Sequence, residues 1–232
     1  MLYAPDWSFI HIPRTGGVNF KHHALQLPFV MEYDAQPDGI ETKIWMHNPP
    51  RFWYEDGKVN DLSPKWVTLV RNPYSRYLSL FFWLQRVSKK SKFKARGHGE
   101  WKTTGDQSFP DFVHADKMRR LWDYREVYDT PWKKYEEMGN MWKPYWAQMD
   151  WIDQWDCEHY RYDVTPFRLE DQLDKLKEFT GVDMTSTALN PSDRPDRWES
   201  YYTQELADVV HSRYEVDFRA FGYDKKSWEI TN

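Results

Sequence analysis

The sequence predicts an α/β fold with three layers, in which a central parallel sheet of about four to five strands is flanked by helices. Short β-branched apolar runs alternate along the chain with longer segments whose apolar residues recur at helical spacing. The chain has 232 residues, of which 40% are hydrophobic and 29% charged, so one domain with a sizeable core can form. We therefore expect a single domain over residues 1–232.

The expected elements follow from apolar spacing and from the residues that end helices and strands. Four runs are expected to form strands: residues 8–11, 43–47, 66–70 and 166–169. Five segments are expected to form helices: residues 18–25, 74–87, 109–125, 170–180 and 204–221. Asn72 and Thr203 are suitable N-caps for two of these helices, and Gly181 and Gly222 are suitable helix stops.

The segment after the first predicted strand has the composition of an anion site. It reads His11-Ile12-Pro13-Arg14-Thr15-Gly16-Gly17, and a helix is expected directly after it. Glycine lets the backbone come close to a ligand, and the N–H groups and dipole of a helix N-terminus attract negative charge. Arg14 adds a permanent charge whose planar fork fits two oxygens of a phosphate or sulfate.

This segment resembles the 5′-phosphosulfate loop of sulfotransferases that use 3′-phosphoadenosine 5′-phosphosulfate (PAPS). It is similar to the branch whose loop reads His-Ile-Pro-Lys-Thr-Gly-Gly, which includes many carbohydrate sulfotransferases. Arg14 stands where that branch has lysine, and Asn19 stands where serine or threonine is common. The resemblance implies a P-loop-like fold and a donor site formed by these residues: Arg14, Thr15, Gly16, Gly17, Val18 and Asn19. Taken alone, the segment could also be an ordinary strand-to-helix turn with a surface arginine.

A second motif follows the third predicted strand. The stretch from Arg71 to Ser79 resembles the family's 3′-phosphate motif, Arg-Asp-Pro-x-x-Arg-x-x-Ser, with Asn72 in place of the aspartate. The resemblance implies that Arg71 and Ser79 bind the 3′-phosphate of the donor. Without it, Arg76 and Ser79 would be interpreted as a solvated helix face. Since the carboxyl ends of parallel strands meet at one edge of a sheet, we expect the two motifs to lie close together.

The middle of the chain resembles nothing in the family, whereas residues 167–173 and 201–223 are similar to its later segments. We expect residues 86–160 to form a variable helical or lid region on the acceptor side. Within it, residues 86–102 carry seven Lys or Arg and one Glu, which predicts a mobile basic loop, either merely solvated or ordering over an anionic ligand. The tryptophan-rich residues 121–155 are interpreted as helices that cover the sheet, in preference to an acceptor-binding wall.

Composition excludes several classes of protein. The net charge of −4 argues against nucleic-acid binding by bulk electrostatics, and no apolar run approaches the length of a membrane span. Cys157 is the one cysteine, so no intrachain disulfide can form, and no signal peptide is visible. We therefore expect a cytoplasmic protein without a metal and without a nucleic-acid or membrane partner.

The leading hypothesis is an enzyme that moves a sulfuryl group from PAPS to an acceptor hydroxyl, on a carbohydrate, by in-line displacement. Arg14 would neutralise charge on the leaving oxygen, and His47, at the end of the second predicted strand, would be the general base. The alternative for His47 is a strand-end cap, and Glu32 and Asp34 are the next candidates for the base.

Two other functions stay open. One is a non-catalytic nucleotide- or glycan-binding protein with the same fold. The other is a P-loop kinase, which is disfavoured because the Gly-Lys-Ser/Thr ending is absent after Gly16.

Overall fold

The computed structural model describes residues 2–32, 65–89, 107–115, 147–152, 163–185 and 197–229. These residues belong to two compact units. The sheet unit comprises residues 1–71 and 128–190, and the helical unit comprises residues 72–127 and 191–232. The expectation of a single domain over the whole chain stays a prediction.

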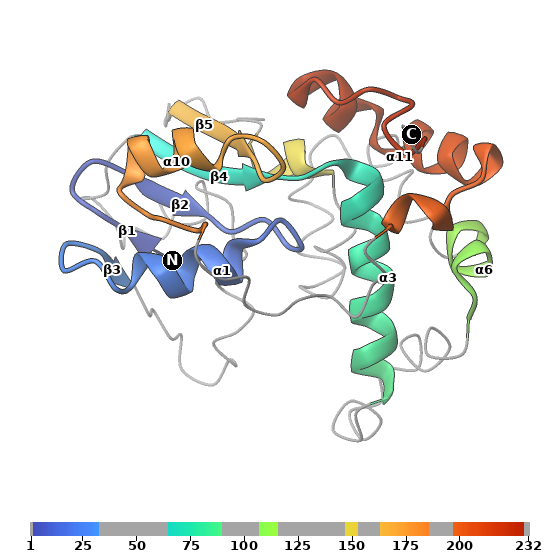
Figure 1. Cartoon of the computed structure of the whole chain (residues 1–232), viewed down its shortest axis with the longest axis horizontal. Coiled ribbons are helices and arrows are strands. Elements are labelled where there is room, and N and C mark those ends of the chain that lie inside the picture. The colour runs from blue at the N-terminus through green and yellow to red at the C-terminus, as the bar shows by residue number, and fades with distance from the viewer. Residues whose placement is uncertain are drawn as a thin grey trace. The chain divides into compact units, whose positions relative to one another are not determined.

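The sheet unit holds a five-stranded mixed sheet of order β3-β1-β2-β4-β5 (Figure 1). Its parallel core consists of β2 (Ser8–Ile10), β4 (Lys65–Val70) and β5 (Asp163–Arg168). Two strands of two residues each, β1 (Leu2–Tyr3) and β3 (Met31–Glu32), extend it with antiparallel pairing. The α/β fold class is confirmed, and the antiparallel extension is its one departure from a purely parallel sheet.

Helices α1 (Gly17–Ala24) and α10 (Leu173–Thr180) pack against the sheet through one shared core. Phe20 of α1 stacks on Phe9 of β2 with ring centroids 4.0 Å apart, and Leu176 of α10 is fully buried in the same cluster. Because Phe9 and Phe20 fix β2 and α1 to each other, the short segment between them has little freedom.

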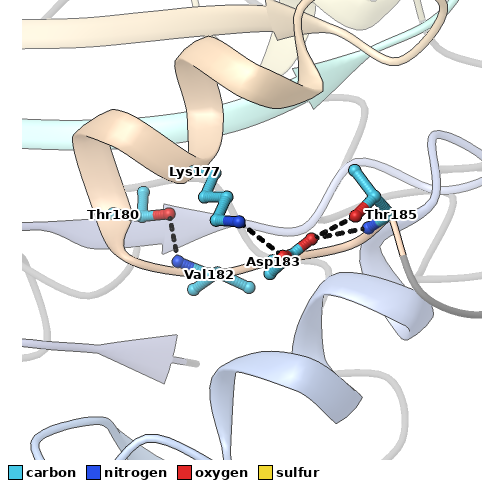
Figure 2. Close-up of polar contacts among 5 residues, drawn as sticks. All are labelled: Lys177, Thr180, Val182, Asp183 and Thr185. Atoms are coloured by element: carbon cyan, nitrogen blue, oxygen red, sulfur yellow. Dashed lines mark hydrogen bonds and ion pairs between the residues drawn. The ribbon is translucent and has the colours of Figure 1, made fainter.

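The chain leaves α10 through a closed turn (Figure 2). Gly181 lies in the left-handed region with φ of 76°, as the predicted helix stop requires. The buried Thr180 hydroxyl donates to the Leu176 carbonyl at 2.7 Å and accepts from the Val182 N–H at 3.1 Å. One hydroxyl therefore satisfies two backbone groups at the end of the helix.

Asp183 adds a charged contact beside this turn (Figure 2). Its Oδ2 accepts from Lys177 Nζ at 2.6 Å, and its Oδ1 accepts from both the hydroxyl and the N–H of Thr185. The hydrogen bond from Lys177, together with those from Thr185, holds the pKa of the Asp183 carboxyl well below its usual range.

The helical unit is built around an aromatic core. It contains α3 (Pro73–Lys89), α6 (Phe109–His114), a short 3-10 helix η4 (Trp198–Tyr201) and α11 (Gln204–Phe221). The rings that meet between these helices include Tyr74, Tyr77, Phe81, Phe109, Phe112, Tyr202, Tyr214 and Phe218.

Tyr202 is a buried residue of this core with a polar group. Its hydroxyl donates to the Tyr74 carbonyl at 2.8 Å, and burial raises the pKa of Tyr202 well above its ordinary value. The phenol therefore stays neutral in the folded protein at pH values where an exposed tyrosine begins to ionise.

The predicted caps are confirmed. Asn72 Oδ1 accepts from the Tyr74 N–H at 3.0 Å at the start of α3, and the Thr203 hydroxyl accepts from the Leu206 N–H at the start of α11. Gly222 ends α11 with φ of 68°. Cap chemistry is local, so the sequence was sufficient to locate these boundaries.

Four predicted boundaries are wrong by more than one residue. The strand expected from residue 166 begins at Asp163. The helix expected over residues 109–125 ends at His114, because Ala115 takes ψ of 123°. The helix expected from residue 170 begins at Leu173, because Arg168 contacts Asp171 and Gln172 and holds a turn there. Helix α3 extends to Lys89, so the first residues of the basic segment 86–102 are helical rather than loop.

Several predictions concern residues outside the described part of the chain. These are the strand at 43–47, the basic residues from 90 onward and most of the tryptophan-rich segment. Within that last segment the structure describes a 3-10 helix, η3 (Gln148–Trp151), whose Trp151 is fully buried.

Candidate functional site

The loop between β2 and α1 has two residues in the left-handed region. Arg14 has φ of 69° and Gly16 has φ of 95°. A non-glycine residue with positive φ is uncommon, and Arg14 is one of the residues predicted to bind the donor. The Thr15 side chain is fully buried and its hydroxyl donates to the Ile12 carbonyl at 2.9 Å, so it closes the loop on itself.

The first turn of α1 is suited to an anion. Its N-cap is Gly16, which supplies no side-chain hydrogen bond, and the turn contains no acidic residue. Val18, in that turn, has half of its surface exposed. The N–H groups of a first helical turn have no partner within the helix, and such a turn is the usual place for an anion at a helix start.

Gly17 is required by the ring of His11. A Cβ atom added to Gly17 would lie 2.1 Å from His11 Cδ2 and 2.4 Å from Nε2. His11 is buried and directly follows β2, which ends at Ile10 and not at residue 11 as expected. The ring therefore fills the space beside the first turn of α1 that a side chain at residue 17 would need.

Arg71, the first residue of the second motif, contacts the loop of the first motif within the sheet unit. Arg71, the residue after β4, donates from Nη1 to the Arg14 carbonyl at 3.3 Å. The contact joins residues 57 positions apart, and the Arg71 side chain is largely buried. The parallel pairing of β2 with β4 produces this proximity, because both segments leave the sheet at its carboxyl edge.

Gln148 of η3 also belongs to this site, and the sequence did not indicate it. Its Oε1 accepts from the Arg71 N–H and its Nε2 donates to the Arg71 carbonyl, each at 2.8 Å. No periodic pattern or motif marks this residue, since its partner lies 77 positions earlier in the chain.

The remaining residues of the second motif lie on α3 in the helical unit. Ser75, Arg76 and Ser79 are all buried, so the interpretation of Arg76 and Ser79 as a solvated face is wrong. Part of the reason is visible for Arg76, whose guanidinium lies over the Tyr214 ring at 5.8 Å from its centroid. The binding of one phosphate by both Arg71 and Ser79 stays a prediction.

Not every predicted site residue can be placed. His47 and Asp34 lie outside the described residues. Glu32, the other carboxylate candidate, lies in β3 and is paired with Lys21 of α1. Among the described residues, no group of three or more His, Cys, Asp or Glu side chains could hold a metal ion.

The sequence also matches a protein-family model. A family model described as "Sulfotransferase family" matches residues 8–224, which include both motifs. The chain belongs to the sulfotransferase family. Membership assigns it to the enzymes that transfer sulfuryl groups, and the resemblance to the carbohydrate branch stays a prediction. No curated protein and no solved structure matches this sulfotransferase-family chain. Of the helices in the described ranges, none has the length and apolar character needed to cross a membrane.

Proposed function

We propose that this chain transfers a sulfuryl group from PAPS to a hydroxyl of a carbohydrate acceptor and releases adenosine 3′,5′-bisphosphate. The observation that carries the proposal is the contact between Arg71 and the Arg14 carbonyl. It joins Arg71, the first residue of the segment that resembles the 3′-phosphate motif, to the loop that resembles the 5′-phosphosulfate loop.

The residues present are compatible with this donor. The first turn of α1 has no acidic residue and Gly17 has no side chain, so phosphate oxygens could approach backbone N–H groups from residue 16 to residue 19. Because the Thr15 hydroxyl is engaged with the Ile12 carbonyl, Thr15 would contribute its backbone rather than its side chain. PAPS, when bound, would supply the sulfuryl group and an adenosine bisphosphate leaving group.

The protein would act by positioning and charge. Arg14 would neutralise charge on the leaving oxygen, and it could not act as a general acid because arginine keeps its proton at working pH. Arg71 and Ser79 would hold the 3′-phosphate. His47 would accept the proton of the acceptor hydroxyl, a role suited to histidine because the ordinary pKa of an imidazole lies near neutrality.

Binding of two nucleotides tests the donor site. In Arg71→Ala, adenosine 3′,5′-bisphosphate should bind tenfold to a hundredfold more weakly, because a charged hydrogen bond contributes about 1.5–3 kcal/mol. Adenosine 5′-phosphate should bind nearly as before. Equal losses for both nucleotides would refute the assignment of Arg71.

Turnover tests the chemistry. The protein would be incubated with labelled PAPS and a panel of glycans, lipids and small alcohols, with products identified by mass spectrometry. Arg14→Ala and His47→Ala should each lower turnover, the latter by about a hundredfold with donor binding retained. If turnover survives in His47→Ala, Glu32 and Asp34 become the candidates. Nucleotide binding without transfer to any acceptor would favour a non-catalytic binding protein.

A further inference from the structure

The Gln148 side chain makes two hydrogen bonds to the backbone of one residue, Arg71. Both are 2.8 Å long, one to the N–H and one to the carbonyl. Gln148 itself is fully buried, with 0% of its surface exposed. A buried amide that pairs with both groups of one residue reproduces the bonding that a neighbouring β-strand would provide.

The sheet explains why a substitute for a strand is needed there. The peptide between Val70 and Arg71 is trans, so its C=O and N–H point in opposite directions. The Val70 carbonyl faces β5, where it accepts from the Leu169 N–H at 2.9 Å. The Arg71 N–H therefore faces the side of β2, where strand pairing has ended with Ile10 opposite Thr68.

Beyond Ile10 the chain cannot continue that ladder. It turns into the loop that contains Arg14, and Pro13 in this turn has no N–H to donate. The Gln148 side chain supplies the hydrogen bonds that a neighbouring strand would supply. The backbone that continues from β4 is therefore hydrogen-bonded for one residue more, at Arg71. That residue is the one whose guanidinium reaches the Arg14 carbonyl.

We infer that Gln148 is a positioning residue that aligns Arg71 for recognition of the donor's 3′-phosphate. The inference rests on the proposed function, in which Arg71 binds that phosphate. The η3 segment, far from both motifs in sequence, thereby takes part in donor selectivity. A small displacement of a charged fork is enough to lose much of a bidentate contact, so backbone alignment controls affinity.

A purely structural role for Gln148 predicts a different result. In that case, loss of the Gln148 hydrogen bonds would lower the free energy of unfolding and would weaken the binding of both nucleotides by the same factor. A positioning role changes the preference for adenosine 3′,5′-bisphosphate over adenosine 5′-phosphate, because only the former carries the 3′-phosphate. The ratio of the two dissociation constants is therefore the readout that separates the two roles.

The test compares Gln148→Met with Thr180→Val as a matched control. Met keeps the volume of the buried side chain and removes both hydrogen bonds to Arg71. Thr180→Val likewise removes two buried hydrogen bonds to backbone, in the same unit but at the end of α10. Calorimetric titration with both nucleotides and thermal unfolding would be measured for each variant and for Arg71→Ala.

Gln148→Met should weaken adenosine 3′,5′-bisphosphate binding about tenfold and adenosine 5′-phosphate binding less than about twofold. Thr180→Val should lose stability without changing the ratio. If Gln148→Met does not fold, Gln148→Asn, whose amide is one methylene too short to keep both hydrogen bonds to Arg71, is measured in the same way.

An unchanged ratio in the folded Gln148 variant, with Arg71→Ala reduced as expected, would overturn the inference and leave the proposed function intact. An unchanged ratio in Arg71→Ala would instead refute the proposed role of Arg71.

Discussion

Substitution of Gly17 by alanine tests the packing of the candidate site. The added Cβ would lie 2.1 Å from His11 Cδ2, whereas unstrained carbon contacts are about 3.5–4.0 Å. About 1.4 Å must therefore come from movement of a buried ring or of the first turn of α1. The ring lies close to Phe9, with centroids 6.1 Å apart, so it has little room on that side. We expect Gly17→Ala to lower the free energy of unfolding by about 2 kcal/mol, as overpacking of a core does.

Gly17→Ala should instead raise the free energy of unfolding when the ring of His11 is absent. In a His11→Ala background the clash disappears, and alanine is favoured over glycine within a helix by about 0.5–1 kcal/mol. The cost of Gly17→Ala should therefore differ between the two backgrounds by about 3 kcal/mol, measured by urea unfolding of all four proteins.

Binding provides a second measurement. Movement of the first turn displaces the N–H groups proposed to hold the phosphosulfate, so affinity for adenosine 3′,5′-bisphosphate should fall about tenfold or more in Gly17→Ala. If Gly17→Ala costs the same in both backgrounds, the ring of His11 is not the reason for glycine at this position, and the reasoning fails.

Substitutions at three further positions address the caps and the titrating groups. Asn72→Ala should lower the free energy of unfolding by about 1 kcal/mol through loss of the cap on the Tyr74 N–H, and Asn72→Asp, which keeps the acceptor, should lose less. Tyr202→Phe should lower the free energy of unfolding by about 1 kcal/mol at pH 7, because the hydrogen bond to the Tyr74 carbonyl is lost. Because burial raises the pKa of Tyr202, wild-type stability should also decline as pH rises above about 10, and less steeply in this variant. Since Lys177 lowers the pKa of Asp183, the free energy of unfolding of the wild type should decline as pH falls below about 4. If Asp183→Asn and the wild type have identical acid unfolding curves, this expectation is contradicted.

The elements that the sequence predicted well are those whose signals are local. β4 is a run of apolar and β-branched residues bounded by a turn, and its place needs no knowledge of the rest of the chain. The caps at Asn72 and Thr203 are equally local, because a side chain bonds a backbone group two or three residues away. The loop from Arg14 to Gly17 was predicted for the same reason, and its proximity to Arg71 followed from parallel pairing.

The features that escaped prediction depend on partners distant in the chain. β3 has two residues and is a strand only because it pairs with β1, where Glu32 lies opposite Leu2. Arg76 resembles a surface residue in sequence, yet its guanidinium is buried over the ring of Tyr214. Gln148 is the clearest case, because an isolated glutamine carries no signal until the backbone that it bonds is in place.

The register of β4 with β5 has a consequence for synthesis on the ribosome. β4 can pair with β2 early, but its other neighbour begins with Asp163 opposite Lys65, about a hundred residues later. At about 5–20 residues per second, one edge of β4 lacks its partner for roughly 5–20 seconds. The exposed sequence, Lys-Trp-Val-Thr-Leu-Val, has high β-propensity and one charge, which is the composition of an aggregation-prone edge. Recombinant yield should therefore respond more strongly to slower translation or added chaperone than the stability of the finished fold would suggest.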